Sequence, residues 1–98
     1  MTRIDLIKTD EARVARIFLD PGESSPAHYH SSVIENVVCL SGKIAIKFGT
    51  GSDQKLLTPG QICEIEQHIE HYLMNPSKAK SEYLLVQKGD YDFVPVNS

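Results

Sequence analysis

Two of the chain's four histidines have a spacing that could hold a metal ion. His28 and His30 are separated by a single residue. On a β-strand this spacing puts both imidazoles on one face, about 6.6 Å apart along the backbone. Two imidazoles placed in this way can converge on one metal ion with bonds of about 2.1 Å. An H-x-H pattern alone is a weak metal signal, so the interpretation depends on what accompanies it.

Glu35 and His71 are the further candidates. Glu35 shares a strand face with Val37 and Cys39 by parity. A carboxylate on such an apolar face carries a desolvation cost, which a bound cation would remove. Taken alone, Glu35 is better explained by an ion pair with a surface Lys or Arg. A single histidine such as His71, which opens a later apolar run, is also more often structural than a metal ligand.

Short strands must position these side chains, because apolar runs alternate with turn residues along the whole chain. No window shows a sustained helical period. The turn signals include Ser41-Gly42, Gly49-Thr50-Gly51-Ser52 and Pro59-Gly60. Strands are expected at Ile4–Ile7, Arg13–Leu19, Val33–Leu40, Lys43–Phe48, Lys55–Leu57, Ile62–Glu66, His71–Met74 and Glu82–Lys88, with Tyr91–Val96 as an edge strand. This pattern predicts an all-β sandwich or barrel.

Two local features refine the strand prediction. Ser41-Gly42 lies between two expected strands and predicts a two-residue hairpin turn that joins them. The cysteines, Cys39 and Cys63, do not form a C-x-x-C pair. We expect both to be buried and free rather than bound in a disulfide.

Length and charge exclude several classes of protein. The 98 residues suffice for one domain, expected to span residues 1–98, and the composition is that of a soluble globular protein. The net charge is −3 and no basic stripe is present, which argues against nucleic acid as a partner. No apolar run is long enough to cross a membrane, and the first ten residues become charged before a signal-peptide core could form. A cytoplasmic location is expected.

The spacing of glycines, histidines and glutamate resembles the two signature motifs of the cupin family. The first motif covers residues 22–42 and the second covers residues 60–75, with seventeen residues, Lys43 to Pro59, between them. The matching positions are Gly22, His28, His30, Glu35 and Gly42 in the first motif, and Gly60, His71 and Asn75 in the second. The resemblance implies a single-domain antiparallel β-barrel of the double-stranded β-helix or jelly-roll type, as in small RmlC-like cupins. It also implies that His28, His30, Glu35 and His71 bind one metal ion.

Two positions depart from the second motif. Glu66 stands where the family usually has proline, and His68 stands where it usually has glycine. Glycine permits a positive φ, which a histidine adopts at some energetic cost. We expect His68 to be a solvated loop residue, with a substrate contact or a replacement ligand as the alternative.

The donor set narrows the choice of metal and ligand. Three imidazoles and one carboxylate suit a divalent transition metal (Fe, Mn, Ni, Cu, Zn or Co) rather than Ca or Mg, which prefer oxygen ligands. An octahedral ion would keep two positions open for water, dioxygen or a chelating substrate. A divalent ion with one carboxylate leaves a charge of +1, which favours a small anionic ligand with a carboxylate, enolate or enediolate beside a second oxygen.

The resemblance does not fix the reaction, because cupin-like proteins include dioxygenases, isomerases, decarboxylases and binding modules. The leading hypothesis is a metal-dependent enzyme for an oxygenated organic acid or sugar-derived metabolite, of the dioxygenase or Lewis-acid isomerase or lyase type. A general base is not identified, and Tyr83, Glu66, Glu70 and His68 are the candidates.

Two other interpretations stay open. The chain could be a non-catalytic module that binds or senses a small molecule, or the metal could only stabilise the core. A homodimer is also expected from the family resemblance. The strand Arg13–Leu19 and the apolar tail support it weakly, since their edges must be covered.

Overall fold

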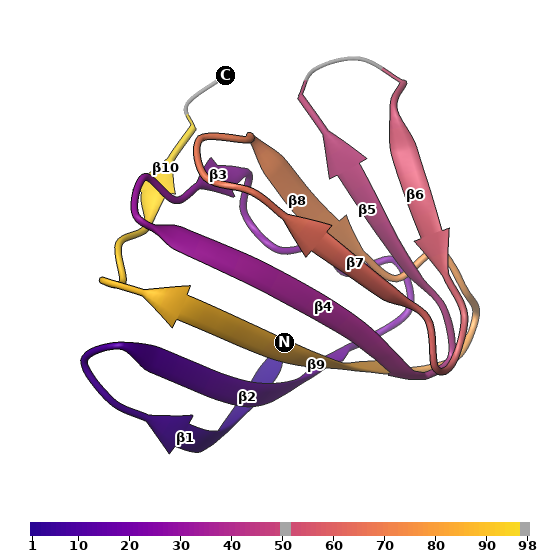
Figure 1. Ribbon diagram of the computed structural model, residues 1–98. Helices are drawn as coiled ribbons and strands as arrows, with labels where there is room; N and C mark the ends of the chain where they lie inside the picture. The colour runs from indigo at the N-terminus through magenta and orange to yellow at the C-terminus, as the bar shows by residue number, and fades with distance from the viewer. Residues whose placement is uncertain (50–51, 97–98) are drawn as a thin grey trace.

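The computed structural model describes residues 1–49 and 52–96 and consists of two five-stranded antiparallel sheets that face each other (Figure 1). The first sheet has the order β1-β2-β9-β4-β7, and the second has the order β10-β3-β8-β5-β6. The strands of the first sheet are β1 (Thr2–Lys8), β2 (Ala12–Leu19), β9 (Ser81–Gly89), β4 (Val33–Ser41) and β7 (Ile62–Ile65). Those of the second are β10 (Val94–Pro95), β3 (His28–Tyr29), β8 (His71–Met74), β5 (Ile44–Phe48) and β6 (Gln54–Leu57).

The described residues contain no helix, so the predicted all-β fold is confirmed. The expected strands are present, with ends that differ by at most two residues except in the C-terminal edge strand. No helix that could span a membrane is found in the described part. The turn expected at Gly49-Thr50-Gly51-Ser52 includes Thr50 and Gly51, which lie outside the described residues.

The core forms between the sheets because β2, β4 and β9 alternate between inward and outward side chains. The largest fully buried side chains include Leu19, Ile44 and Ile46. Cys39 and Cys63 are buried and free, which confirms the prediction for the cysteines. These apolar residues belong to one buried cluster that also includes Val37 and Leu73.

The predicted hairpin turn at Ser41-Gly42 is wrong. β4 pairs with β7 and β9, whereas β5 pairs with β6 and β8, so this turn carries the chain from one sheet to the other. Gly42 has a φ of +71°, and a Cβ atom there would overlap the Ser81 hydroxyl. The same hydroxyl accepts a hydrogen bond from the Lys43 amide at 3.0 Å. Glycine is therefore required where the chain passes close to β9 and changes sheets.

The C-terminal edge strand is shorter than expected. Only Val94 and Pro95 pair with another strand, opposite Tyr29 and His28 of β3. Residues 91–93 lie outside the strands, and Tyr91 and Phe93 lie beside His28 and His30. This part of the tail contributes to the candidate site.

Candidate metal centre

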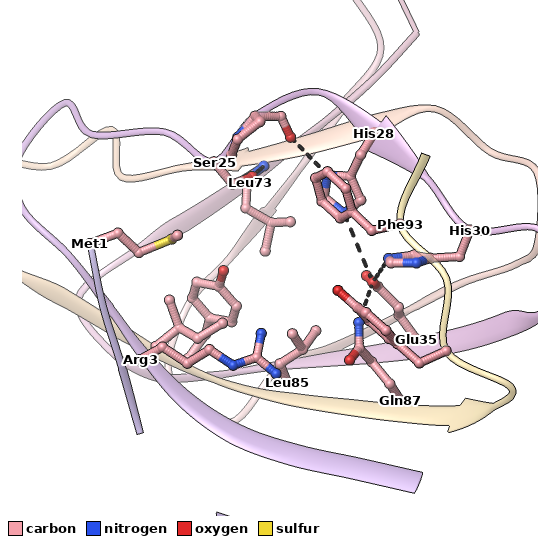
Figure 2. Close-up of a pocket in the computed structure, with 14 residues that line it drawn as sticks. Met1, Arg3, Ser25, His28, His30, Glu35, Leu73, Leu85, Gln87 and Phe93 are labelled. Carbon is pink, nitrogen blue, oxygen red and sulfur yellow. Dashed lines mark hydrogen bonds and ion pairs between the residues drawn. The ribbon is translucent and has the colours of Figure 1, made fainter. Parts of the chain in front are cut away.

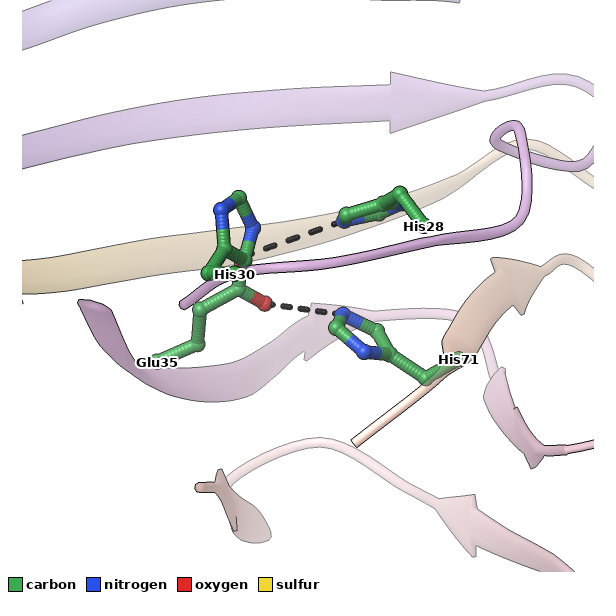
Figure 3. Close-up of side chains that lie close together, drawn as sticks. All are labelled: His28, His30, Glu35 and His71. Atoms are coloured by element: carbon green, nitrogen blue, oxygen red, sulfur yellow. Dashed lines mark hydrogen bonds and ion pairs between the residues drawn. The ribbon is translucent and has the colours of Figure 1, made fainter. Parts of the chain in front are cut away.

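The four predicted ligands come from three strands and the residue that follows one of them, and they lie together between the two sheets (Figure 3). His28 begins β3, His30 follows that strand directly, and His71 begins β8. Register places His28 opposite His71 within the second sheet, while Glu35 approaches from β4 in the first. All four are buried, and none is more than 7% exposed. The sequence prediction that these residues converge therefore agrees with the structure.

The distances within this cluster fit a single ion. The four candidate ligand atoms lie within 4.8 Å of one another. His71 Nε2 is 3.1 Å from one Glu35 oxygen, and His28 Nε2 is 4.0 Å from the other, which His30 Nε2 also contacts. Ligands bonded at about 2.1 Å to one octahedral ion would be about 3 Å apart when adjacent and about 4.2 Å apart when opposite. Small adjustments of the side chains would give that geometry.

Main-chain carbonyl groups fix which ring nitrogen of each histidine carries the proton. The Nδ1 atom of His28 lies 2.7 Å from the Pro26 oxygen, and that of His71 lies 2.8 Å from the Ile69 oxygen. His30 Nδ1 contacts the Asp92 oxygen in the same way. Because a carbonyl oxygen only accepts, each Nδ1 must donate. In a neutral imidazole this leaves a lone pair on Nε2, the arrangement typical of metal-binding histidines.

These lone pairs all face an acceptor. The three Nε2 atoms point at the Glu35 carboxylate, which has no proton to donate when ionised. His30 Nε2 is buried and, despite its contact with Glu35, has no hydrogen-bond partner in the described part of the chain. Buried acceptors that face one another are unfavourable unless protons or a cation lie between them. A metal ion satisfies all four groups at once, so the residues present fit the metal that the sequence predicted.

The electrostatics of the cluster favour a cation. Burial acts to raise the pKa of the Glu35 carboxyl, but the His28, His30 and His71 imidazoles against its oxygens outweigh it and hold this pKa well below its usual range. Burial acts to lower the pKa of His30, but Glu35 and the Asp92 carbonyl raise it by more. The carboxylate is therefore ionised, and its surroundings attract positive charge.

Residues outside the ligand set hold it in place. Gln87 Nε2 donates to a Glu35 oxygen at 2.9 Å, and both side chains are buried. The ring of Phe93, from the tail, stacks on His28 with centroids 4.5 Å apart. The Asp92 carboxylate accepts hydrogen bonds from the Ser31 and Ser32 amides, which anchors the tail beside His30.

Sequence reasoning missed these supporting residues. Gln87 carried a usable signal, since it is a polar residue on the inward face of the strand Glu82–Lys88, as Glu35 is on its own strand. Asp92 and Phe93 carried none, because they act from an irregular segment whose path depends on the folded barrel.

A comparison with known families decides the classification. A family model described as the cupin domain matches residues 15–94, which is most of the chain. The chain belongs to the cupin family. A comparison with curated proteins finds no match.

Solved structures with a similar fold support this assignment. An uncharacterised conserved protein with a double-stranded β-helix domain from Klebsiella pneumoniae has a TM-score of 0.88 at 19% identity, covering 99% of this chain and 84% of its own. An oxalate oxidase has a TM-score of 0.77 at 17% identity, covering 88% of this chain and 46% of its own. A cupin-superfamily sugar phosphate isomerase from Silicibacter pomeroyi has a TM-score of 0.71 at 23% identity, covering 80% and 50%. At these identities the similarity establishes the double-stranded β-helix fold.

This cupin has a small pocket beside the histidines (Figure 2). Its volume of about 80 Å³ has room for a few water molecules or one small ligand. The wall is apolar at Ile17, Leu73 and Leu85 and polar at a few points. Besides the ligand residues, the polar side chains that line it are Arg3, Ser25, Tyr83, Gln87 and Tyr91.

Of the four candidate bases, one lines the pocket and three do not. Tyr83 is 2% exposed and lines the pocket. Glu66, His68 and Glu70 are exposed in the loop before β8 and do not line the pocket. His68 has a φ of +66°, as the glycine-like position in the motif suggested, and its amide donates to the His30 oxygen at 2.7 Å. His68 is therefore an exposed loop residue outside the four-residue cluster.

Proposed function

We propose that this cupin is a metal-dependent enzyme whose substrate is a small oxygenated organic acid or sugar-derived metabolite. His28, His30, Glu35 and His71 would hold one divalent transition metal. The observation that carries this proposal is the convergence of three Nε2 lone pairs on a buried, ionised carboxylate. The fold neighbours are consistent with it, since they include an oxalate oxidase and a sugar phosphate isomerase.

When bound, such a metal supplies Lewis acidity or, if it is redox active, dioxygen chemistry. The chain's own residues would prepare the substrate. Apolar walls at Ile17, Leu73 and Leu85 would limit the water around a bound substrate, which strengthens its polar contacts. Burial raises the pKa of Tyr83, so its hydroxyl stays protonated and can donate a hydrogen bond to a substrate oxygen.

The pocket composition favours some reactions over others. Among the residues that line it, no carboxylate or imidazole outside the four ligand residues could act as a general base. This favours dioxygen chemistry over proton abstraction. The same observation favours a second candidate function, a non-catalytic module that binds or senses a small acid at the metal.

Turnover assays separate these two functions. The protein would be loaded with Fe, Mn or Ni and incubated with α-keto acids, β-diketones and uronates. A His71→Gln variant would be treated with the same metals and compounds. Turnover by the parent and its loss in the variant would support the enzyme. Metal-dependent increases in melting temperature on adding these compounds, without turnover, would support the binding module instead. If a metal-loaded protein shows neither turnover nor a melting shift, both proposed functions are contradicted.

A further inference from the structure

Arg3 brings a positive charge into the pocket from the N-terminal strand. β1 pairs with β2 so that Arg3 lies opposite Ile17. Directly opposed residues of an antiparallel pair share one face of the sheet. Ile17 is 3% exposed and lines the pocket, so Arg3 also faces inward although β1 is an edge strand. Figure 2 shows its side chain extending into the pocket near Leu85.

One hydrogen bond orients the Arg3 guanidinium and leaves its other donors available. Its Nε donates to Asp5 Oδ1 at 2.9 Å, and this is its one hydrogen bond among the described residues. That hydrogen bond lowers the pKa of Asp5. The Asp5 carboxylate therefore stays ionised and continues to accept the hydrogen bond from Nε. The two terminal amino groups remain free for a ligand. A guanidinium fork of this kind matches the two oxygens of a carboxylate.

Arg3 and the histidines lie at opposite ends of the pocket (Figure 2). Between them the wall is apolar, at Ile17, Leu73 and Leu85. A ligand that contacts both ends would need an oxygenated group at the metal, a short carbon chain and an anionic group at Arg3. The small volume favours a planar carboxylate over a bulkier phosphate.

We propose that Arg3 determines specificity by binding the terminal carboxylate of a short hydroxy- or oxo-dicarboxylic acid whose other end chelates the metal. This inference rests on the proposed function, because it assumes that the metal centre holds the chelating end. Arg3 acts in binding and selection. The chemistry stays with the metal centre.

Two acids of nearly equal size test this proposal. Malate and 2-hydroxybutanoate share the chelating 2-hydroxycarboxylate and differ only in a terminal carboxylate or methyl group. Their affinities for the nickel-loaded protein would be measured by isothermal titration calorimetry for the parent, Arg3→Gln and Lys8→Gln. Lys8→Gln is the matched control, since it removes one positive charge from β1 at an exposed residue that does not line this pocket.

The parent and Lys8→Gln should bind malate about tenfold more tightly than 2-hydroxybutanoate, from one charge-assisted contact. Arg3→Gln should lose this preference and keep its affinity for 2-hydroxybutanoate. Three results would overturn the inference about Arg3. They are equal binding of the two acids by the parent, binding of neither acid by the parent, and an unchanged preference for malate in Arg3→Gln. Nickel uptake is measured first, so failure of the metal centre itself would be recognised separately.

Discussion

At the scale of single residues, Glu35 is the group on which the candidate centre depends. It is 1% exposed and it contacts His30 and His71. It also accepts a hydrogen bond from Gln87. It brings the only formal negative charge among the four proposed ligands, so it balances part of the charge of a divalent ion.

Replacing Glu35 with Gln should reduce metal affinity by at least about a hundredfold, since even supporting residues around metal sites cost about 10–100-fold when removed. The measurement is a competition titration with a chromogenic chelator. Glu64→Gln is the control, because it makes the same charge change on the exposed face of β7. Equal affinities in the two variants would mean that Glu35 is not a ligand.

The two thiols give a prediction for pH. Burial raises the pKa of both Cys39 and Cys63. Because the thiolate is the reactive form, a raised pKa means less reaction at any given pH below it. At pH 8 the folded protein should react with iodoacetamide much more slowly than the protein unfolded in guanidinium, and the difference should narrow as the pH rises above about 9. Equally fast alkylation of the folded protein, measured by mass spectrometry, would contradict the burial of the thiols.

At the scale of elements, β4 shows how much could be predicted from the sequence. Parity alone predicted that Glu35, Val37 and Cys39 share a buried face, and all three are at most 1% exposed. The motif spacing then predicted which distant histidine meets Glu35. These predictions hold because a strand's side-chain period is fixed by its backbone geometry.

The path of the chain after β4 could not be predicted in the same way. Ser41-Gly42 has the composition of a hairpin turn, but the chain changes sheets there because it passes close to Ser81 of β9, a residue far away in the sequence. Arg3 and Phe93 were missed for a related reason. Their contribution to the pocket depends on the register of β1 against β2, and on the pairing of β10 with β3, which joins segments far apart in the sequence.

Glycine substitutions test the close approach of β9 to the loop before β4. Gly89 has a φ of +121°, and a Cβ atom there would overlap the Ser32 carbonyl oxygen. Gly60 also has a positive φ, of +90°, but open space around it. Gly60→Ala should therefore lower the free energy of unfolding by about 1 kcal/mol from backbone strain alone. Gly89→Ala should lower it by about 3 kcal/mol, since a backbone atom must also move.

Urea denaturation of the two glycine variants and the parent gives the comparison. Equal losses of stability would show that β9 does not approach Ser32 as closely as the structure indicates.

At the scale of the whole molecule, the outer face of the first sheet carries several exposed apolar side chains. Ile4, Leu6 and Ile62 are each more than 40% exposed, and Leu84 and Val38 lie side by side at the centre of this face. An apolar sheet face of this kind is typical of an interface. We propose that residues 1–98 form one domain and that two copies pair through this face.

Substituting Leu84 with Glu should convert the dimer to a monomer, because it buries a charge at the centre of the interface. Light scattering coupled to size-exclusion chromatography gives the mass. Leu56→Glu is the control, since Leu56 is 48% exposed but belongs to β6 in the other sheet. A monomeric parent, or a dimer that survives Leu84→Glu, would argue against this interface.

The central claim is that the four buried residues bind a transition metal, and metal content tests it most directly. Elemental analysis by inductively coupled plasma mass spectrometry would be made on protein purified without a metal-affinity column, beside a His28→Gln/His71→Gln variant whose β-structure is checked by circular dichroism. We predict close to one equivalent of Fe, Mn, Ni, Cu, Zn or Co in the parent and almost none in the variant. A parent that contains no metal, and takes up none when each ion is added, would contradict the claim.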